Sequence, residues 1–217
     1  VKVWRDGVCE RTIRAHTEYV TAVAVLPGGA RFVSVSDDGT AKLWTLDGTL
    51  ERTFEIKLNT IIWCVAALPD GVHFAVGVGG RFGEVRLYHV DGTLVHTFEG
   101  QIPDHEDEEW SVDAVALTPD GQHIISGSYD KLVKVWSVAS KSLVSTCTGH
   151  KSWVHAVAAM PDGQRILSGS YNGEVRVWLF NRTLQNTFEL HTATVTALVA
   201  LPDKQHALSA SWDHTVK

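Results

Sequence analysis

Short apolar runs follow one another along the whole chain and are separated by polar turns. Within most runs apolar and polar residues alternate, which is the period of a half-buried β-strand, and no window sustains the period of a helix. Gly, Asp and Asn mark the breaks, as at Asp38-Gly39 and Asp47-Gly48, and these residues are typical of hairpin turns. The pattern therefore predicts an all-β chain of antiparallel strands.

One order of strands and turns recurs through the chain. An apolar strand is followed by Pro-Asp-Gly, by a strand that carries Ser-x-Ser, and by a strand that ends in an aromatic residue. These aromatic residues recur about every 40 to 48 residues, with roughly four predicted strands in each interval. They are Trp4, Trp44, Tyr88, Trp136 and Trp178. A period of this length indicates stacked units that bury one another's apolar faces.

The clearest copy of the repeat contains Gly149-His150, Pro161-Asp162-Gly163, Ser168 and Trp178. With this spacing the chain resembles the WD-repeat β-propeller family over essentially its whole length. The resemblance implies blades of four antiparallel strands, a to d, arranged around a central axis. Runs rich in Ala and Val that scarcely alternate suit the innermost strand a, which is packed on both faces. These runs are 20–26, 61–68, 112–118, 154–160 and 195–201.

We predict a single WD-repeat β-propeller domain over residues 1–217. Its repeats cover about 14–55, 56–99, 100–148 and 149–189, and a split blade combines 190–217 with 1–13. If this split blade closes, the result is a five-bladed ring without a free strand edge. However, Val216-Lys217 and Val1-Lys2 occupy the same position of the repeat. The alternative is therefore a fragment of a seven-bladed propeller, or a ring completed by a partner chain or by further copies of this chain.

Composition and charge narrow the class of partner. The formal net charge is −6, and an acidic run at 104–109 supplies most of it, so the basic stripe needed for nucleic-acid binding is not expected. No apolar run is long enough to span a membrane, and no signal peptide is evident, so no membrane partner is expected. Cys9, Cys64 and Cys147 lie in different repeats, which fits a reducing, cytoplasmic protein without disulfides. No metal site or cofactor is predicted.

Ser, His and Asp recur at matched positions of the repeats, a combination that nucleophilic enzymes use. An enzyme needs one active site rather than one in each blade, so this repetition favours a structural role. The family resemblance implies a buried network of hydrogen bonds among His, Ser, Asp and Trp, and such a network stabilises a blade when every polar group is paired. The predicted network residues are His16, Ser34, Asp38, Trp44, Ser126, Asp130, Trp136, His150, Ser168, Asn172, Trp178, His191, Ser209, Asp213 and Trp4.

Two repeats depart from the pattern on loops that should open at one face of the propeller, the face of the d–a and b–c loops. The second repeat has Leu58, Phe82 and Tyr88 in the places of His, Asp and Trp. The third has a longer loop before its first strand, and the acidic residues of this loop are Asp104, Glu106, Asp107, Glu108 and Glu109. A run of like charges is usually a solvated surface. Its functional alternatives are attraction of a basic segment or, less favoured by its spacing, a weak cation site.

The same face is predicted to be the partner-binding surface. Four of the eight tryptophans, Trp63, Trp110, Trp153 and Trp212, lie outside the strand-c positions and should cluster there. The family resemblance implies that peptides or protein loops bind at such positions, and Tyr, Trp and Arg are the residue types that dominate binding hot spots. The competing interpretation is that several of these residues only cover the blade ends. By counting along the repeat, the position just before the turn Asp is assigned to Asp37, Arg81, Tyr129, Tyr171 and Trp212. The predicted binding residues are Tyr19, Trp63, Arg81, Phe82, Tyr129, Trp153, His155, Tyr171 and Trp212.

The predicted function is a non-catalytic scaffold for protein–protein interaction that binds a peptide or protein loop. One alternative is a propeller that uses its channel mouth as a small-ligand or enzyme site. Another is an excised or engineered repeat array whose role is assembly. Fold alone does not choose a partner, because one scaffold serves many functions.

Overall fold

The computed structural model describes residues 1–56, 60–80, 83–100 and 110–217. These ranges hold strands β1 to β20 and no helix, which confirms the all-β prediction. Accordingly, none of them contains a helix long and apolar enough to cross a bilayer. Several residues singled out from the sequence lie outside the described ranges, namely Leu58, Arg81, Phe82, Asp104, Glu106, Asp107, Glu108 and Glu109.

Four antiparallel sheets of four strands each form complete blades, as the repeat predicts. The first blade consists of β3 (Val20–Val25), β4 (Arg31–Ser36), β5 (Thr40–Thr45) and β6 (Leu50–Glu55). The second consists of β7 (Ile62–Ala67), β8 (His73–Val78), β9 (Glu84–His89) and β10 (Leu94–Glu99). The third consists of β11 (Val112–Leu117), β12 (His123–Ser128), β13 (Val133–Ser137) and β14 (Ser142–Cys147). The fourth consists of β15 (Val154–Ala159), β16 (Arg165–Ser170), β17 (Glu174–Leu179) and β18 (Leu184–Glu189).

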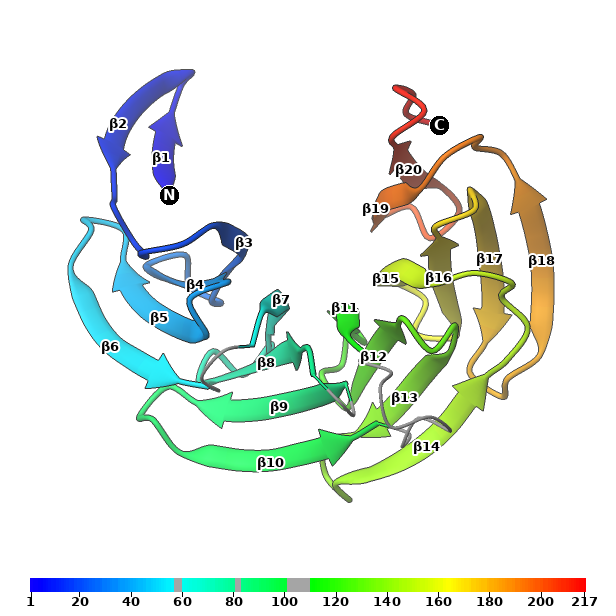
Figure 1. Ribbon diagram of the computed structural model, residues 1–217, viewed down its shortest axis with the longest axis horizontal. Coiled ribbons are helices and arrows are strands. Elements are labelled where there is room, and N and C mark those ends of the chain that lie inside the picture. Colours follow the sequence, from blue (N-terminus) through cyan, green and yellow to red (C-terminus); the bar gives the residue numbers. More distant parts are fainter. Residues whose placement is uncertain (57–59, 81–82, 101–109) are drawn as a thin grey trace.

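The two ends of the chain form separate two-stranded sheets and do not build the blade that closure would require. One sheet pairs β1 (Lys2–Arg5) with β2 (Val8–Thr12), and the other pairs β19 (Val195–Ala200) with β20 (Ala207–Ser211). They lie at opposite ends of an open arc (Figure 1). Val216 bridges Ala210 of its own sheet, so the place that the amino-terminal strand would need is already occupied. The architecture is thus an open propeller arc rather than a closed five-bladed ring.

Strand a of each blade lines the inner side of the arc. β3, β7, β11, β15 and β19 follow one another there as neighbours (Figure 1). Close contact between blades depends on glycine in strand b. A Cβ on Gly77 would lie only 2.4 Å from Cys64 Sγ and 2.6 Å from the Val112 carbonyl oxygen of the next blade. The glycine therefore sets the distance between the two sheets.

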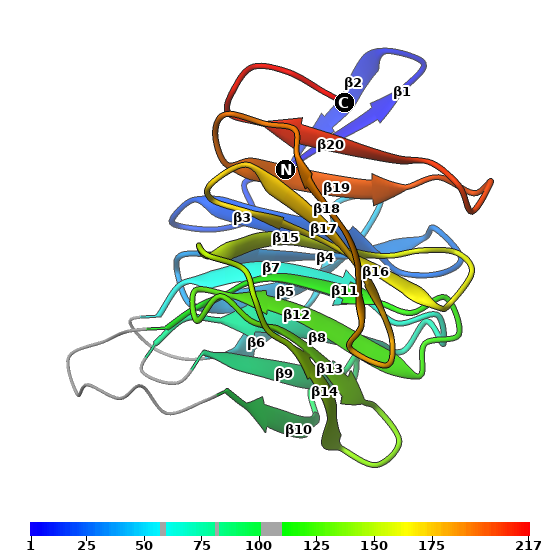
Figure 2. The ribbon, with the colours of Figure 1, turned by 90° about the vertical axis from the view of Figure 1, so that its right-hand side faces the viewer.

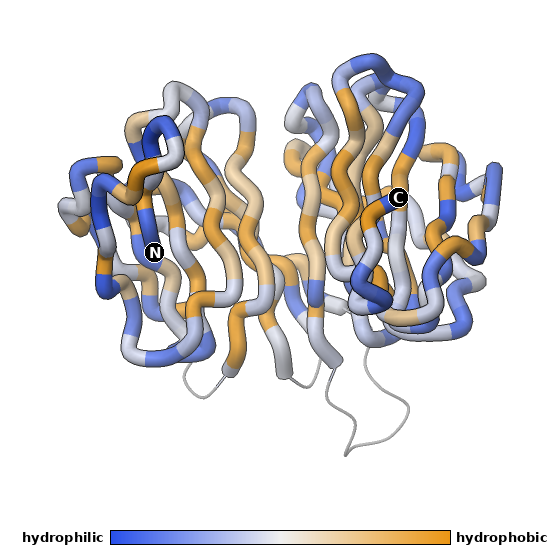
Figure 3. The backbone as a smooth tube through the Cα atoms, turned by 90° about the horizontal axis from the view of Figure 1, so that it is seen from above, coloured by the Kyte–Doolittle hydropathy of each residue, from blue (hydrophilic) through white to orange (hydrophobic). Residues whose placement is uncertain are grey.

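The core consists of the layers between adjacent blades. Trp178 is 1% exposed and packs with Ile125, Val133 and Val154 of two blades. Apolar residues run along the strands, whereas hydrophilic residues gather at many of the turns (Figure 3). The turns themselves lie at two opposite faces of the arc (Figure 2). Rigid sheets therefore hold the loops of each face in fixed positions.

Candidate protein-binding face

The predicted network residues of the first blade form a set of hydrogen bonds. His16 Nε2 lies 2.7 Å from Ser34 Oγ, and Trp44 Nε1 donates to the same oxygen at 2.9 Å. On the other side of the ring, His16 Nδ1 lies 2.9 Å from Asp38 Oδ2. Burial alone would raise the pKa of Asp38, yet hydrogen bonds from Thr40 and His16 lower it to about 2. These groups bond one another within the blade.

The network varies in the other sheets. In the third blade Trp136 Nε1 donates to Ser126 Oγ at 2.9 Å, while Asp130 pairs with Lys134 at 2.6 Å. In the carboxyl-terminal sheet His191 Nε2 lies 2.7 Å from Ser209 Oγ, and its Nδ1 lies 2.8 Å from Asp213 Oδ2. Trp4 was predicted to complete this last set. It is 58% exposed and belongs to the sheet at the opposite end of the arc, because the split blade is not formed.

The fourth blade uses a different acid from the one expected. His150 Nε2 lies 2.6 Å from Ser168 Oγ, but Asn172 accepts a hydrogen bond from Ser170 and does not contact the imidazole. Glu174 faces His150 Nδ1 instead, at 3.6 Å, and pairs with Arg176 at 3.1 Å. Burial, together with the charge of Arg176, lowers the pKa of His150 to about 4. The sequence contains a signal for this exchange. Asn172 replaces the turn Asp of the other repeats, and a glutamate, Glu174, stands two residues later.

Three aromatic rings of the predicted binding surface lie in contact, and we call them the aromatic row: Tyr129, Trp153 and Tyr171. Tyr129 of the third blade stacks on Trp153 of the fourth, with ring centroids 3.8 Å apart. Trp153 then contacts Tyr171, at 4.9 Å between centroids. The backbone N–H of Tyr171 donates to the Trp153 carbonyl at 2.9 Å, which fixes the turn beside the start of β15. The row thus crosses the junction of two blades.

The remaining predicted binding residues are spread along the arc. His155 Nδ1 lies 3.3 Å from Asp113 Oδ2, and the His155 ring lies 6.3 Å from that of Trp212. Trp212 is 61% exposed. Tyr19 is 80% exposed in the first blade and has no ring partner among the described residues. Tyr19 is therefore not part of the aromatic row.

A depression of about 380 Å³ lies next to the row, between the second and third blades. The depression exists because the second blade has a glycine, Gly79, where the third and fourth blades have Tyr129 and Tyr171. The three positions are equivalent because the backbone N–H of each donates to the start of strand a in its own blade, at 3.0 Å to the Ile61 carbonyl for Gly79. Counting along the sequence assigned this place to Arg81, but the two extra residues of this turn come after the equivalent position. We call the depression the Gly79 recess, and its side-chain walls are Trp63, Trp110, Ser111 and Tyr129.

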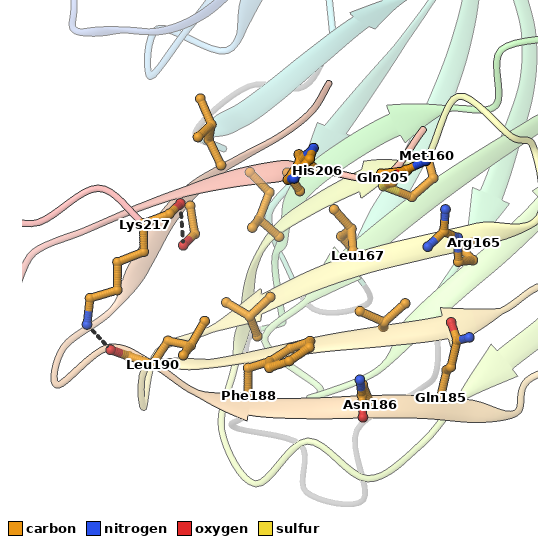
Figure 4. Close-up of a pocket in the computed structure, with 16 residues that line it drawn as sticks. Met160, Arg165, Leu167, Gln185, Asn186, Phe188, Leu190, Gln205, His206 and Lys217 are labelled. Atoms are coloured by element: carbon orange, nitrogen blue, oxygen red, sulfur yellow. Dashed lines mark hydrogen bonds between the residues drawn. The ribbon is translucent and has the colours of Figure 1, made fainter. Parts of the chain in front are cut away.

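Another cavity, of about 360 Å³, lies between β17–β18 and the sheet of β19 and β20 (Figure 4). Phe188 lines it and is 37% exposed. The matching residues of the first two blades, Phe54 and Phe98, are buried to 4% and 2% exposure beneath the next four-stranded sheet. The cavity therefore occupies the volume that outer strands fill elsewhere in the arc, and we do not interpret it as a ligand site.

Side-chain chemistry on the described ranges is limited. They contain no group of three or more His, Cys, Asp or Glu side chains arranged to hold a metal ion. The Ser, His and Asp side chains that repeat through the chain belong to the networks described above. What this face offers is therefore aromatic surface, a recess and one carboxylate–imidazole pair.

Comparison with known proteins places these features in a family context. A family model described as "WD domain, G-beta repeat" matches residues 7–45, 92–137, 141–178 and 182–217. The chain is 28% identical over 155 residues to Cilia- and flagella-associated protein 52 of Macaca fascicularis, covering 69% of this chain and 26% of that protein. For the Chlamydomonas reinhardtii protein of the same name the identity is 31% over 140 residues, covering 62% and 21%.

A second group of relatives shares the repeat. WD repeat-containing protein 90 of Homo sapiens is 29% identical over 139 residues, which cover 61% of this chain and 7% of that protein. The matches thus span about a quarter or less of the length of these curated relatives.

Proposed function

The chain belongs to the WD40 family (WD domain, G-beta repeat), and we propose that it is a non-catalytic scaffold that binds a peptide or protein loop on the face of the d–a and b–c loops. Proteins with these repeats are generally scaffolds for protein–protein interaction. The observation that carries the proposal for this chain is the aromatic row, in which Tyr129, Trp153 and Tyr171 are in contact across two blades.

The row has the physical properties of a binding hot spot. Tyr171 is 47% exposed, so a partner can still bury much of its ring. The three rings support one another, so little side-chain entropy is lost when a partner orders them. Large aromatic side chains of this kind dominate the energy of protein interfaces. The blades themselves are held by separate, buried hydrogen bonds, which leaves the row free for recognition.

The non-catalytic part of the proposal rests on the same networks. Ser34 and Ser168 are fully buried, and each lies within hydrogen-bond distance of a histidine and a tryptophan. A nucleophile needs access to its substrate as well as a base. Their burial therefore supports a structural role.

The relatives named for cilia and flagella suggest where such a scaffold works, and we include an intracellular, ciliary or flagellar setting in the proposal. Two of the three cysteines are buried. Burial raises the pKa of the Cys64 thiol and raises that of Cys147 to about 11, which keeps both thiols protonated and unreactive.

The test starts from a random peptide-display library selected against the chain. The affinity of a selected peptide is then measured for the parent, Trp153→Ala and Tyr171→Ala. We expect each substitution to weaken binding about tenfold or more, as truncation of a hot-spot aromatic does. Trp4→Ala is the matched control, because Trp4 is an exposed tryptophan outside this face. Unchanged affinity in both row variants, or loss of the folded state along with binding, would count against the proposal.

A further inference from the structure

The Gly79 recess, of about 380 Å³, is large enough to hold one side chain of a bound peptide. Three aromatic residues line it, Trp63, Trp110 and Tyr129, and they come from two adjacent blades. Trp110 is held at the rim by its backbone N–H, which donates to the Gly80 carbonyl at 3.0 Å. A Cβ on Gly79 would meet Trp63 Nε1 at 3.2 Å, so the recess depends on the missing side chain.

The polar side-chain atoms of the recess include an acceptor, Ser111 Oγ, beside a buried carboxylate, and a donor, the Nε1–H of Trp63. Ser111 Oγ donates its proton to Asp113 Oδ1, which leaves lone pairs on the Ser111 oxygen as acceptors. The Asp113 side chain is only 10% exposed, and its Oδ2 lies 3.3 Å from His155 Nδ1. No Lys or Arg is among the residues that line the recess over the described ranges. Aromatic faces carry negative potential and attract cations, and the net charge of −6 adds attraction at longer range.

Building on the proposed binding function, we propose that the Gly79 recess receives the guanidinium of an arginine from the bound peptide or loop. A guanidinium is planar, so it stacks on tryptophan and tyrosine rings, and its donors match the free acceptor on Ser111. An acidic side chain would meet aromatic faces and a nearby carboxylate. A neutral side chain of the same shape would lose the charge-dependent part of the attraction.

The probe is acetyl-Gly-Arg-Gly-amide, and its matched control replaces arginine by citrulline, which keeps the shape but not the charge. Binding is followed by NMR through the indole N–H signals of Trp63 and Trp110, which Trp→Phe variants assign. We expect saturable shifts of these signals with the arginine peptide and about fivefold or greater weakening with citrulline. Equal affinity for the two peptides, or no saturable shift with arginine, overturns the proposal. Arg81→Ala is titrated in parallel as a control for the arginine that follows Gly79 by two residues in the sequence.

Two substitutions test the recess itself. Gly79→Tyr should fill it and abolish the arginine-dependent shifts. Gly79 has no positive φ, and tyrosine stands at the same place in the next two blades. The Trp63 side chain has to shift slightly, because its Nε1 would lie 3.2 Å from the new Cβ. Trp63→Leu should weaken the arginine peptide about tenfold. Retained signals of the buried Trp136 and Trp178 report that each variant is folded. Arginine binding that survives Gly79→Tyr refutes the assignment.

The same variants separate this inference from the proposed function. A display-selected peptide that loses affinity with Trp153→Ala but not with Gly79→Tyr refutes the arginine site and leaves the binding face intact. A selected peptide that is insensitive to both substitutions refutes both proposals. Sensitivity to both, with an arginine required in the peptide, supports both.

Discussion

Replacement of Ser168 by alanine isolates the energy of the hydrogen-bond network in the fourth blade. Ser168 Oγ accepts a hydrogen bond from Trp178 Nε1 at 2.7 Å and lies 2.6 Å from His150 Nε2. All three residues are buried, at 0%, 1% and 6% exposure. The substitution removes one oxygen and creates almost no cavity. Its main effect is to leave a buried indole N–H and a buried imidazole nitrogen without a partner.

The expected loss follows from these two orphaned groups. A buried polar group left without a hydrogen bond costs about 1–3 kcal/mol, so Ser168→Ala, which orphans two such groups, should lower the free energy of unfolding by about 2–6 kcal/mol. With a urea dependence of about 3 kcal/mol per molar, the midpoint of unfolding should fall by about 0.7–2 M. The other nitrogen of His150, Nδ1, does not compensate for the lost bond, because it has no hydrogen-bond partner among the described residues.

Ser145→Ala is the matched control. Ser145 is 4% exposed, but its Oγ has no hydrogen-bond partner among the described residues, so alanine removes an unsatisfied polar group. We expect this variant to be as stable as the parent or slightly more stable. Urea unfolding of the three proteins, followed by circular dichroism and by tryptophan fluorescence, makes the comparison. Equal midpoints for the two alanine variants would refute the claim that paired serines stabilise the blades.

Three further predictions address packing, pH and thiol chemistry. Gly77→Ala should destabilise the chain by about 1–3 kcal/mol in urea unfolding, because its Cβ would lie 2.6 Å from the Val112 carbonyl oxygen of the next blade; stability equal to the parent would contradict this close contact between blades. Because folding lowers the pKa of His150 to about 4, the neutral imidazole should contribute about 3 kcal/mol to the free energy of unfolding above pH 6.5, and this contribution should be lost as pH falls through 4. When unfolding is measured at several pH values, the free energy of unfolding should therefore depend less steeply on pH in His150→Asn than in the parent. In the native protein at pH 8, Cys9 should react with a thiol reagent well before Cys64 and Cys147, which are buried; mass spectrometry of the labelled peptides would reveal any other order.

Most of the fold could be predicted from the sequence because strand alternation and repeat length are local properties. The runs expected for strand a at 20–26 and 154–160 became Val20–Val25 and Val154–Ala159. In the first and fourth blades, the His, Ser and Trp side chains at the matched positions also lie within hydrogen-bond distance of one another. Where a repeat was regular, counting along the sequence was enough to place a side chain.

Counting failed where the repeat was irregular. Arg81 was assigned to the position before the turn, but the hydrogen bond to Ile61 gives that position to Gly79. Asn172 was assigned to the network of the fourth blade, but Glu174 faces the histidine there. In both cases the sequence records which residues are present, and the three-dimensional path of the turn determines which of them reaches the site.

The sequence by itself determined the blades of this protein, because a strand period of two and a repeat of constant order specify which residues pair and which face is buried. The tertiary structure alone decided which side chains of neighbouring blades come together. Trp63 and Tyr129 line one recess, and Tyr129 stacks on Trp153, only because neighbouring sheets are held at a fixed distance. The open arc was decided in the same way, since the carboxyl-terminal segment pairs with its own sheet. Contacts between segments far apart in the chain depend on the angle and spacing of whole sheets, which no local pattern encodes.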